Sequence, residues 1–275
     1  MILDKSKIAI LTTVINWDLY KKSSQYFPDG VQKYVIDGGA GLFGVDSIYY
    51  MMEKLKKKDI DWLIMADEDV LFLNSDTIYE VIDYMFLNDF ILCGVRDGGE
   101  IPNRTYSPFL INTFFSIVNL KKLKLIWNKM EIKKNQFVLE NEFKEDFSNL
   151  KESFDLMSLY EPYYCFYFWL RRKGEKILFL KADTPFNDGI TTLVYSPNNE
   201  KILYHTWYAR SYGNSKKHTD RIDGVFNLLT FNPTNYQEPI VWKDHLFFIK
   251  RFIRKQNKRL KMKIKILKKK LFEKK

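Results

Sequence analysis

The first hundred residues of this 275-residue chain alternate short apolar runs with segments of helical spacing. Continuous runs rich in β-branched and aromatic residues indicate strands buried on both faces, and such strands are typical of parallel sheets covered by helices. The alternation therefore predicts an α/β fold with a mainly parallel, Rossmann-like sheet flanked by helices. We expect strands at 7–15, 31–37, 60–66 and 90–95, and helices at 45–58 and 76–87.

The pattern beyond residue 100 is less regular. The aromatic-rich stretch 160–174 predicts a helix that ends at Gly174, because glycine readily adopts the left-handed conformation common after a helix. The highly charged stretch 130–160 predicts an insertion of helix or loop. Further strands are expected at 176–180, 191–195 and 201–205.

The formal net charge of +10 is unevenly distributed along the chain. Residues 243–275 hold 15 lysines and arginines against two acids, so the remaining 242 residues hold 29 basic and 32 acidic side chains. We therefore expect a mildly acidic globular part, 1–241, followed by a basic tail, 242–275.

Cysteine usage and hydropathy indicate a soluble intracellular protein. Cys93 and Cys165 lie far apart without a partner motif, which favours reduced thiols over a disulfide scaffold. No apolar stretch approaches the roughly 20 residues of a membrane span, and the N-terminal residues do not resemble a secretory signal.

Three consecutive acids, Asp67, Glu68 and Asp69, follow the strand expected at 60–66. On an extended chain Asp67 and Asp69 point to one side and Glu68 to the other, so the two aspartates can reach one ion. Carboxylate oxygens suit Mg²⁺ or Mn²⁺, and these ions leave room for phosphate oxygens. The plain alternative is that the strand simply reaches the surface. Ligands of α/β sheets bind beyond the carboxyl ends of the strands, which favours metal and diphosphate binding.

On these residues the chain resembles the nucleotide-sugar glycosyltransferases of the GT-A fold. The run WLIMADEDVLF, 62–72, is similar to the family's strand that ends on Asp-x-Asp, a motif that binds the donor's ribose and the metal on its diphosphate. The resemblance implies a GT-A-like fold, a Mn²⁺ or Mg²⁺ cofactor, and transfer of a sugar from a nucleotide sugar, in the first place a UDP-sugar. It also implies a nucleotide-binding half, about 1–100, and an acceptor half, about 101–241.

The resemblance implies donor contacts at two further strand ends. Thr12 and Thr13 end the first strand, where such enzymes cradle the nucleotide. Asp37 ends the second strand, where the family often contacts the base or ribose.

The segment 107–127 resembles one in retaining sugar transferases related to bacterial galactosyltransferases. Asn112 and Asn119 match its pattern, and Asn112 is the implied donor contact. Phe114 stands where that segment usually has glycine, a departure that bears on the subfamily.

His205 ends the strand expected at 201–205. The resemblance implies that a late histidine completes the metal site with Asp67 and Asp69, and neutral imidazole is a competent ligand beside carboxylates. The alternative is an ordinary core or surface histidine. Arg210 follows closely, and its guanidinium fork fits phosphate oxygens of the donor.

The catalytic group is implied less directly. Inverting members of the family place a carboxylate base near the start of a helix like 160–174, where Glu161 stands and would deprotonate an acceptor hydroxyl. The alternative is an acid placed favourably by the helix dipole. Asp97 and Asp188 lie in glycine-containing loops and are candidates for contacting the donor sugar or acceptor, with turn formation as the alternative.

Four aromatic residues are candidates for stacking on sugar rings. Ordinary core packing is the default explanation for aromatic side chains in so aromatic a chain. The candidates are Tyr163, Tyr164, Trp207 and Tyr208.

The tail has the spacing of a basic amphipathic helix. One stripe of it is aliphatic, and Phe247, Phe248 and Phe252 are the expected anchors at an anionic membrane surface. Nucleic-acid contact, a coiled-coil partner and a solvated tail are the alternatives. The stripe comprises Leu246, Ile249, Ile253, Leu260, Ile264, Leu267 and Leu271.

Some lipopolysaccharide glycosyltransferases resemble this design. The resemblance implies a peripheral protein on the cytoplasmic face of the inner membrane that acts on a glycan or lipid-linked acceptor of surface polysaccharide or lipopolysaccharide. Nucleic acid is disfavoured as a partner, because the globular part has no basic stripe with interleaved aromatics.

Two other functions compete with sugar transfer. The first is a non-enzymatic protein that binds nucleic acid or membrane through its tail and carries the acids only as surface charge. The second is a nucleotidyltransferase that makes a sugar nucleotide. Such enzymes usually carry a glycine-rich basic loop after the first strand, and 12–22, TTVINWDLYKK, has no glycine.

Overall fold

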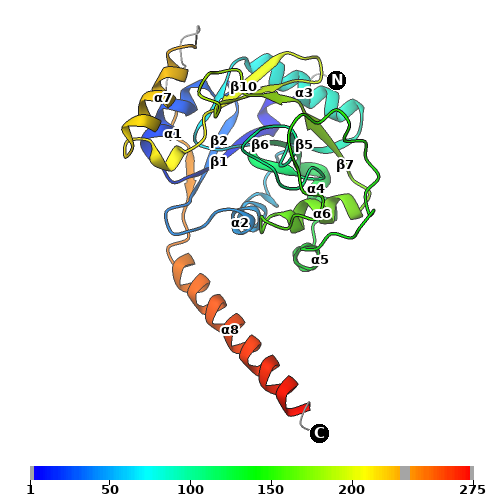
Figure 1. The fold of residues 1–275 in the computed structure, drawn as a ribbon. Coiled ribbons are helices and arrows are strands. Elements are labelled where there is room, and N and C mark those ends of the chain that lie inside the picture. Colours follow the sequence, from blue (N-terminus) through cyan, green and yellow to red (C-terminus); the bar gives the residue numbers. More distant parts are fainter. Residues whose placement is uncertain (1–2, 230–235, 273–275) are drawn as a thin grey trace.

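The computed structural model describes residues 3–229 and 236–272, and its centre is a seven-stranded sheet (Figure 1). Its strands are β1 (Ile8–Val14), β2 (Gln32–Asp37), β3 (Trp62–Ala66), β5 (Phe90–Arg96), β6 (Ile111–Asn119), β7 (Lys176–Leu180) and β11 (Ile240–Trp242). They lie in the order β11-β2-β1-β3-β6-β5-β7. Only β6 runs antiparallel to its neighbours, so the predicted mainly parallel sheet is confirmed.

A second sheet of four antiparallel strands lies against the first. Its order is β4-β10-β9-β8. Two of its strands occupy the ranges expected near 191–195 and 201–205, but β4, which begins directly after the three acids, was not predicted. The strands are β4 (Val70–Phe72), β8 (Ala182–Asp183), β9 (Thr192–Tyr195) and β10 (Lys201–His205).

Helices cover both faces of the main sheet and enclose two apolar cores. One core lies beneath α2, α4, α5 and α6, and the other lies between the sheet, α1, α3 and the second sheet. The helices are α1 (Trp17–Ser23), α2 (Val45–Leu55), α3 (Ser75–Leu87), α4 (Leu120–Ile126), α5 (Lys129–Lys134), α6 (Tyr164–Arg172) and α7 (Lys216–Phe226).

The aromatic helix α6 is shorter than the expected range 160–174. It begins at Tyr164, and every residue from Tyr164 to Leu170 is buried, as expected of a helix that is apolar all round. Gly174 follows its end at φ +79°, as predicted. Glu161 therefore lies in the turn ahead of the helix and not within it. The preceding stretch, 135–163, contains neither helix nor strand.

The basic tail forms α8 (Phe247–Phe272), which extends away from the globular part (Figure 1). Phe248 and Phe252 are exposed, and so are the described members of the predicted stripe. Phe247 packs into the core beneath α2, so the prediction that it is a membrane anchor is wrong. Leu267 and Leu271 lie outside the residues whose side chains the structure describes. No described helix has the length and apolar character required to cross a bilayer.

Candidate metal and nucleotide-sugar site

The three acids occupy a turn between the two sheets. The backbone N–H of Val70 donates to the carbonyl of Asp67 at 3.2 Å, and β4 then starts at Val70. Val70 lies opposite His205 in the antiparallel pair of β4 and β10, and the N–H of Thr206 donates to the carbonyl of Asp69 at 3.1 Å. This pairing brings a histidine from far along the chain to the acidic turn.

Asp67, Asp69 and His205 form the acid–histidine cluster. One ligand atom from each lies within 4.8 Å of the others, and Nε2 of His205 is 3.2 Å from Oδ1 of Asp69. Burial and the carboxylates of Asp69 and Glu68 raise the pKa of Asp67 well above its usual range. The positive charge of Arg210 opposes this rise in the pKa of Asp67, but among the described residues no lysine or arginine forms an ion pair with either aspartate. Two carboxylates and an imidazole, with no ion pair to a protein cation, fit Mn²⁺ or Mg²⁺.

The imidazole of His205 is held between aromatic rings. It stacks on Phe114 with ring centroids 4.2 Å apart and an interplanar angle of 7°, and Trp207 lies at 4.3 Å. Its Nδ1 has no hydrogen-bond partner among the described residues, although metal-binding histidines usually donate through the second nitrogen. Phe114 stands where the sugar transferases that residues 107–127 resemble usually have glycine, and it orients the histidine by packing.

Glu68 faces away from the acid–histidine cluster, toward the start of α1. Its carboxylate accepts the backbone N–H groups of Ile15 at 3.1 Å and Asn16 at 3.2 Å. Burial, and next the nearby carboxylate of Asp69, raise the pKa of Glu68 to about 7. The glutamate thus anchors the turn that follows β1.

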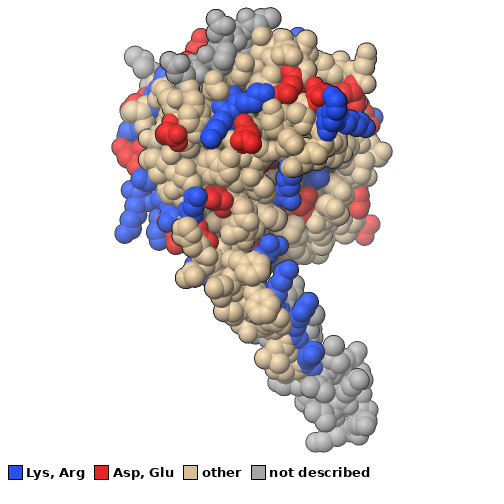
Figure 2. Space-filling view, turned by 90° about the vertical axis from the view of Figure 1, so that its left-hand side faces the viewer, with Lys and Arg blue, Asp and Glu red and all other residues tan. Residues whose placement is uncertain are grey.

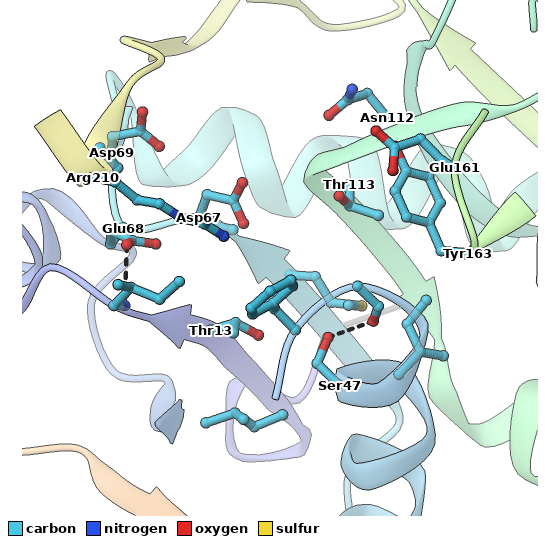
Figure 3. Close-up of a pocket in the computed structure, with 18 of the residues that line it drawn as sticks. Thr13, Ser47, Asp67, Glu68, Asp69, Asn112, Thr113, Glu161, Tyr163 and Arg210 are labelled. Carbon is cyan, nitrogen blue, oxygen red and sulfur yellow. Dashed lines mark hydrogen bonds between the residues drawn. The ribbon is translucent and has the colours of Figure 1, made fainter. Parts of the chain in front are cut away.

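A cavity of about 800 Å³ opens beyond the carboxyl ends of β1 and β3. This volume falls within the range typical of small-molecule sites. Figure 3 shows Asp67 and Arg210 on one side of it, with Glu161 and Tyr163 on the opposite side and Thr13 between them. The cavity therefore places the acid–histidine cluster and the predicted base on facing walls.

Glu161 is held by a buried group that we call the Asp97 network, which comprises Asp97, Arg104, Asn112 and Tyr164. Arg104 lies 3.1 Å from the Glu161 carboxylate and pairs with both oxygens of Asp97, at 2.6 and 2.9 Å. Asn112 donates to Asp97 at 2.6 Å, and the Tyr164 hydroxyl donates to it as well. This network fixes the position of the Glu161 carboxylate.

Asp97 itself is fully buried and does not line the cavity. The expectation that it contacts sugar or acceptor is therefore corrected, because the network's donors already occupy its carboxylate. Asn112 does line the cavity, and its side-chain amide nitrogen is engaged with Asp97. Its contact with the donor stays a prediction.

Of the three predicted donor contacts at the ends of β1 and β2, one lines the cavity and two do not. Thr13 lines the cavity, whereas Thr12 is buried and absent from its lining, as the alternation of side chains along β1 dictates. Asp37 is also absent from the lining. Its carboxylate accepts the N–H of Gly39 at 2.9 Å and lies 3.2 Å from Lys243.

Asp188 is a turn residue outside the cavity. Its carboxylate accepts the backbone N–H groups of Ile190 at 2.9 Å and Thr191 at 3.0 Å, and Arg221 lies at 3.4 Å. These hydrogen bonds favour the alternative of turn formation, and contact of Asp188 with the donor sugar or acceptor stays a prediction.

Two consecutive aromatic residues reach the cavity through strained backbone. Trp207 and Tyr208 have φ values of 59° and 62° and both line the cavity. Left-handed backbone at a residue other than glycine costs on the order of 1 kcal/mol or more and tends to occur at functional sites. Tyr164 is instead part of the buried core, so core packing holds for it.

The sequence-based prediction missed one wall of the cavity. The loop between β2 and α2 supplies Gly41 and Phe43, and α8 supplies Arg251. The guanidinium carbon of Arg210 lies 4.9 Å from the centre of the Phe43 ring, and that of Arg251 lies 5.5 Å from it. The glycines of 38–44 were the available signal, whereas Arg251 had been assigned to the tail.

No family model and no curated protein matches the chain. The solved structures with some similarity include three of sugar-transferring proteins. A Drosophila beta-1,4-galactosyltransferase 7 in complex with manganese, UDP-Gal and xylobiose is 13% identical, over 87% of this chain and 81% of that one, with a TM-score of 0.41. The glycosyltransferase GlyE of Streptococcus pneumoniae is 11% identical, over 85% and 66%, with a TM-score of 0.33.

The third structure is the mannosyltransferase PcManGT of Pyrobaculum calidifontis in complex with GDP-Man and Mn²⁺. It is 7% identical, over 45% of this chain and 47% of that one, with a TM-score of 0.29. TM-scores below 0.5 do not establish a family, so the case for a function rests on the residues of the site.

Proposed function

We propose that this protein is a metal-dependent glycosyltransferase that moves a sugar from a nucleotide sugar, in the first place a UDP-sugar, to a glycan or glycolipid acceptor. The observation that carries the proposal is the acid–histidine cluster. Among the described residues its carboxylates form no ion pair with a lysine or arginine, and they open on a cavity of about 800 Å³. A divalent ion bound there would supply the missing positive charge and would in turn bind the diphosphate of the donor.

The two walls of the cavity divide the chemistry. Asp67, Asp69 and His205 would hold Mn²⁺ or Mg²⁺, which when bound stabilises charge on the departing nucleoside diphosphate. On the opposite wall Glu161 accepts the proton of the acceptor hydroxyl. Arg104 is a positioning residue, since it holds the Glu161 carboxylate at 3.1 Å.

Donor binding tests the proposal. The thermal stability of the full chain is measured with UDP-, GDP- and CMP-sugars, with and without Mn²⁺. We expect a UDP-sugar to raise the melting temperature only with Mn²⁺, and Asp69→Asn to abolish the rise. Asp59→Asn, a change at an exposed carboxylate, is the matched control and should respond like the wild type. A chain that responds to no donor contradicts the proposal.

The tail supports a location. We propose that α8 lies on the anionic inner face of the cytoplasmic membrane, where lipid-linked acceptors of surface polysaccharide or lipopolysaccharide would be met. Phe248 is 69% and Phe252 54% exposed, and Figure 2 shows basic side chains along the described part of the helix. Apolar anchors beside basic residues suit an anionic lipid surface.

Vesicle binding tests this location. Co-sedimentation with phosphatidylglycerol-containing vesicles is compared between the wild-type chain and the full-length double variant Phe248→Ser, Phe252→Ser. These changes leave Phe247 in the core and Arg251 at the cavity. We expect the double variant to lose most of its binding, and equal binding by both chains would refute the anchor.

A further inference from the structure

The nine arginines of the protein fall into two groups, six that form an ion pair with a described acid and three that do not. Among the described residues Arg210, Arg251 and exposed Arg259 of α8 form no ion pair within 4 Å, although the charge of Arg210 acts on Asp67 from farther away. Arg210 and Arg251 differ from Arg259 in lining the cavity. The other six arginines each pair with an acid: Arg96, Arg104, Arg171, Arg172, Arg221 and Arg254.

The two unpaired guanidinium groups of the cavity face the same aromatic ring. Arg210 follows β10 and Arg251 belongs to α8, yet both lie over Phe43. Asp67 offsets part of the charge of Arg210, but two positive groups so placed still repel each other unless an anion joins them. Arg104, the third arginine of the cavity, is already neutralised by Asp97 and Glu161.

Arg251 has a defined position. A Cβ atom on Gly41 would lie 2.5 Å from its Nη1, so glycine at this position leaves room for the guanidinium. Arg254, one turn later, pairs with Asp46 at 2.8 Å, and Phe247, one turn earlier, is buried in the core. The first turns of α8 therefore belong to the wall of the cavity.

We propose that Arg210 and Arg251 form a phosphate subsite at the wall of the cavity around Phe43, for a phosphate or diphosphate ester of a substrate. The guanidinium fork matches phosphate oxygens, and the ring beneath the two groups holds them without neutralising them. The inference deepens the proposed function and rests on it for the substrate. The anion is either the donor's diphosphate or the phosphate that links a lipid to an acceptor glycan.

Binding of inorganic pyrophosphate to the full chain, measured by calorimetry in metal-free buffer, tests the subsite. We expect Arg251→Gln to weaken it by about tenfold to a hundredfold, the usual effect of losing a charge-assisted contact. Arg259→Gln removes the same charge from the same helix away from the cavity and should bind like the wild type. Equal affinity of Arg251→Gln and wild type, with unchanged melting temperatures, would overturn the subsite.

The same measurement with saturating UDP and Mn²⁺ identifies the source of the anion. Pyrophosphate binding that persists and still depends on Arg251 assigns the subsite to the acceptor, and competition assigns it to the donor's diphosphate. The subsite and the proposed function also fail separately. If no nucleotide sugar binds but pyrophosphate binding depends on Arg251, the transferase proposal fails alone. If donors bind and Arg251→Gln changes nothing, the subsite fails alone.

Discussion

The acid–histidine cluster and the Asp97 network both follow strands of the main sheet, yet they treat buried carboxylates in opposite ways. Asp97 is fully buried and surrounded by donors from Arg104, Asn112 and Tyr164. Asp67, by contrast, has acids for neighbours, and burial together with these acids raises its pKa. A buried carboxylate that accepts hydrogen bonds from several donors stabilises the fold, whereas a buried carboxylate without such donors is a candidate for binding a ligand.

Removal of Asp97 should have the largest effect. Asp97→Ala leaves Arg104 buried with Glu161 as its single carboxylate partner, and breaking a buried pair costs about 3–5 kcal/mol. We expect a loss of this size in the free energy of unfolding, measured by urea titration. Asp183→Ala removes an exposed partner of Lys151 and should cost less than about 1 kcal/mol. Equal losses in the two variants would mean that Asp97 is no structural centre.

A substitution at Glu161 tests the proposed catalytic step without breaking the Asp97 network. We expect Glu161→Gln to lower kcat by about a hundredfold or more, because the amide cannot accept the acceptor's proton. Donor affinity and melting temperature should stay near the wild-type values, since Arg104 keeps its bidentate pair with Asp97. Exposed Glu140→Gln is the matched control. An unchanged kcat would place the base elsewhere.

Helices and strands were predictable from the sequence wherever their signal comes from neighbouring residues. Apolar runs and helical spacing depend on neighbouring residues, so β1, β2, β3 and β5 appear where they were expected. β4 has only three residues, and its pairing with β10 far along the chain defines it. The prediction that His205 lies beside the acids depended on the resemblance. The structural reason is the pairing of β10 with β4, a strand that was not predicted.

The role of each acid was harder to predict, because it depends on partners distant in sequence. Asp97 and Asp67 both follow apolar strands, and no local signal shows that Tyr164 reaches one of them. Arg251 was read from the tail's charge pattern as a surface residue, although packing of Phe247 carries it to the cavity. Charge compensation is a property of the folded chain.

Glu68 provides the smallest and most specific test of the contrast. Its pKa of about 7 lies above that of an exposed glutamate, so the folded chain binds more protons than the unfolded chain between about pH 4.5 and 7. The free energy of unfolding of the metal-free protein should therefore fall as pH rises through this window. A shift of this size corresponds to at most about 3 kcal/mol.

Glu68→Gln keeps an oxygen that can accept the N–H groups of Ile15 and Asn16 but removes the charge beside Asp69. We expect the variant to be more stable than the wild type by about 1–2 kcal/mol at pH 8, and to show a shallower dependence on pH. Urea unfolding at pH 5, 6, 7 and 8 in metal-free buffer measures both. Equal stability of the two chains at pH 8 would show that the ionised Glu68 carboxylate does not destabilise the fold. It would also weaken the argument that the acidic turn requires a bound cation.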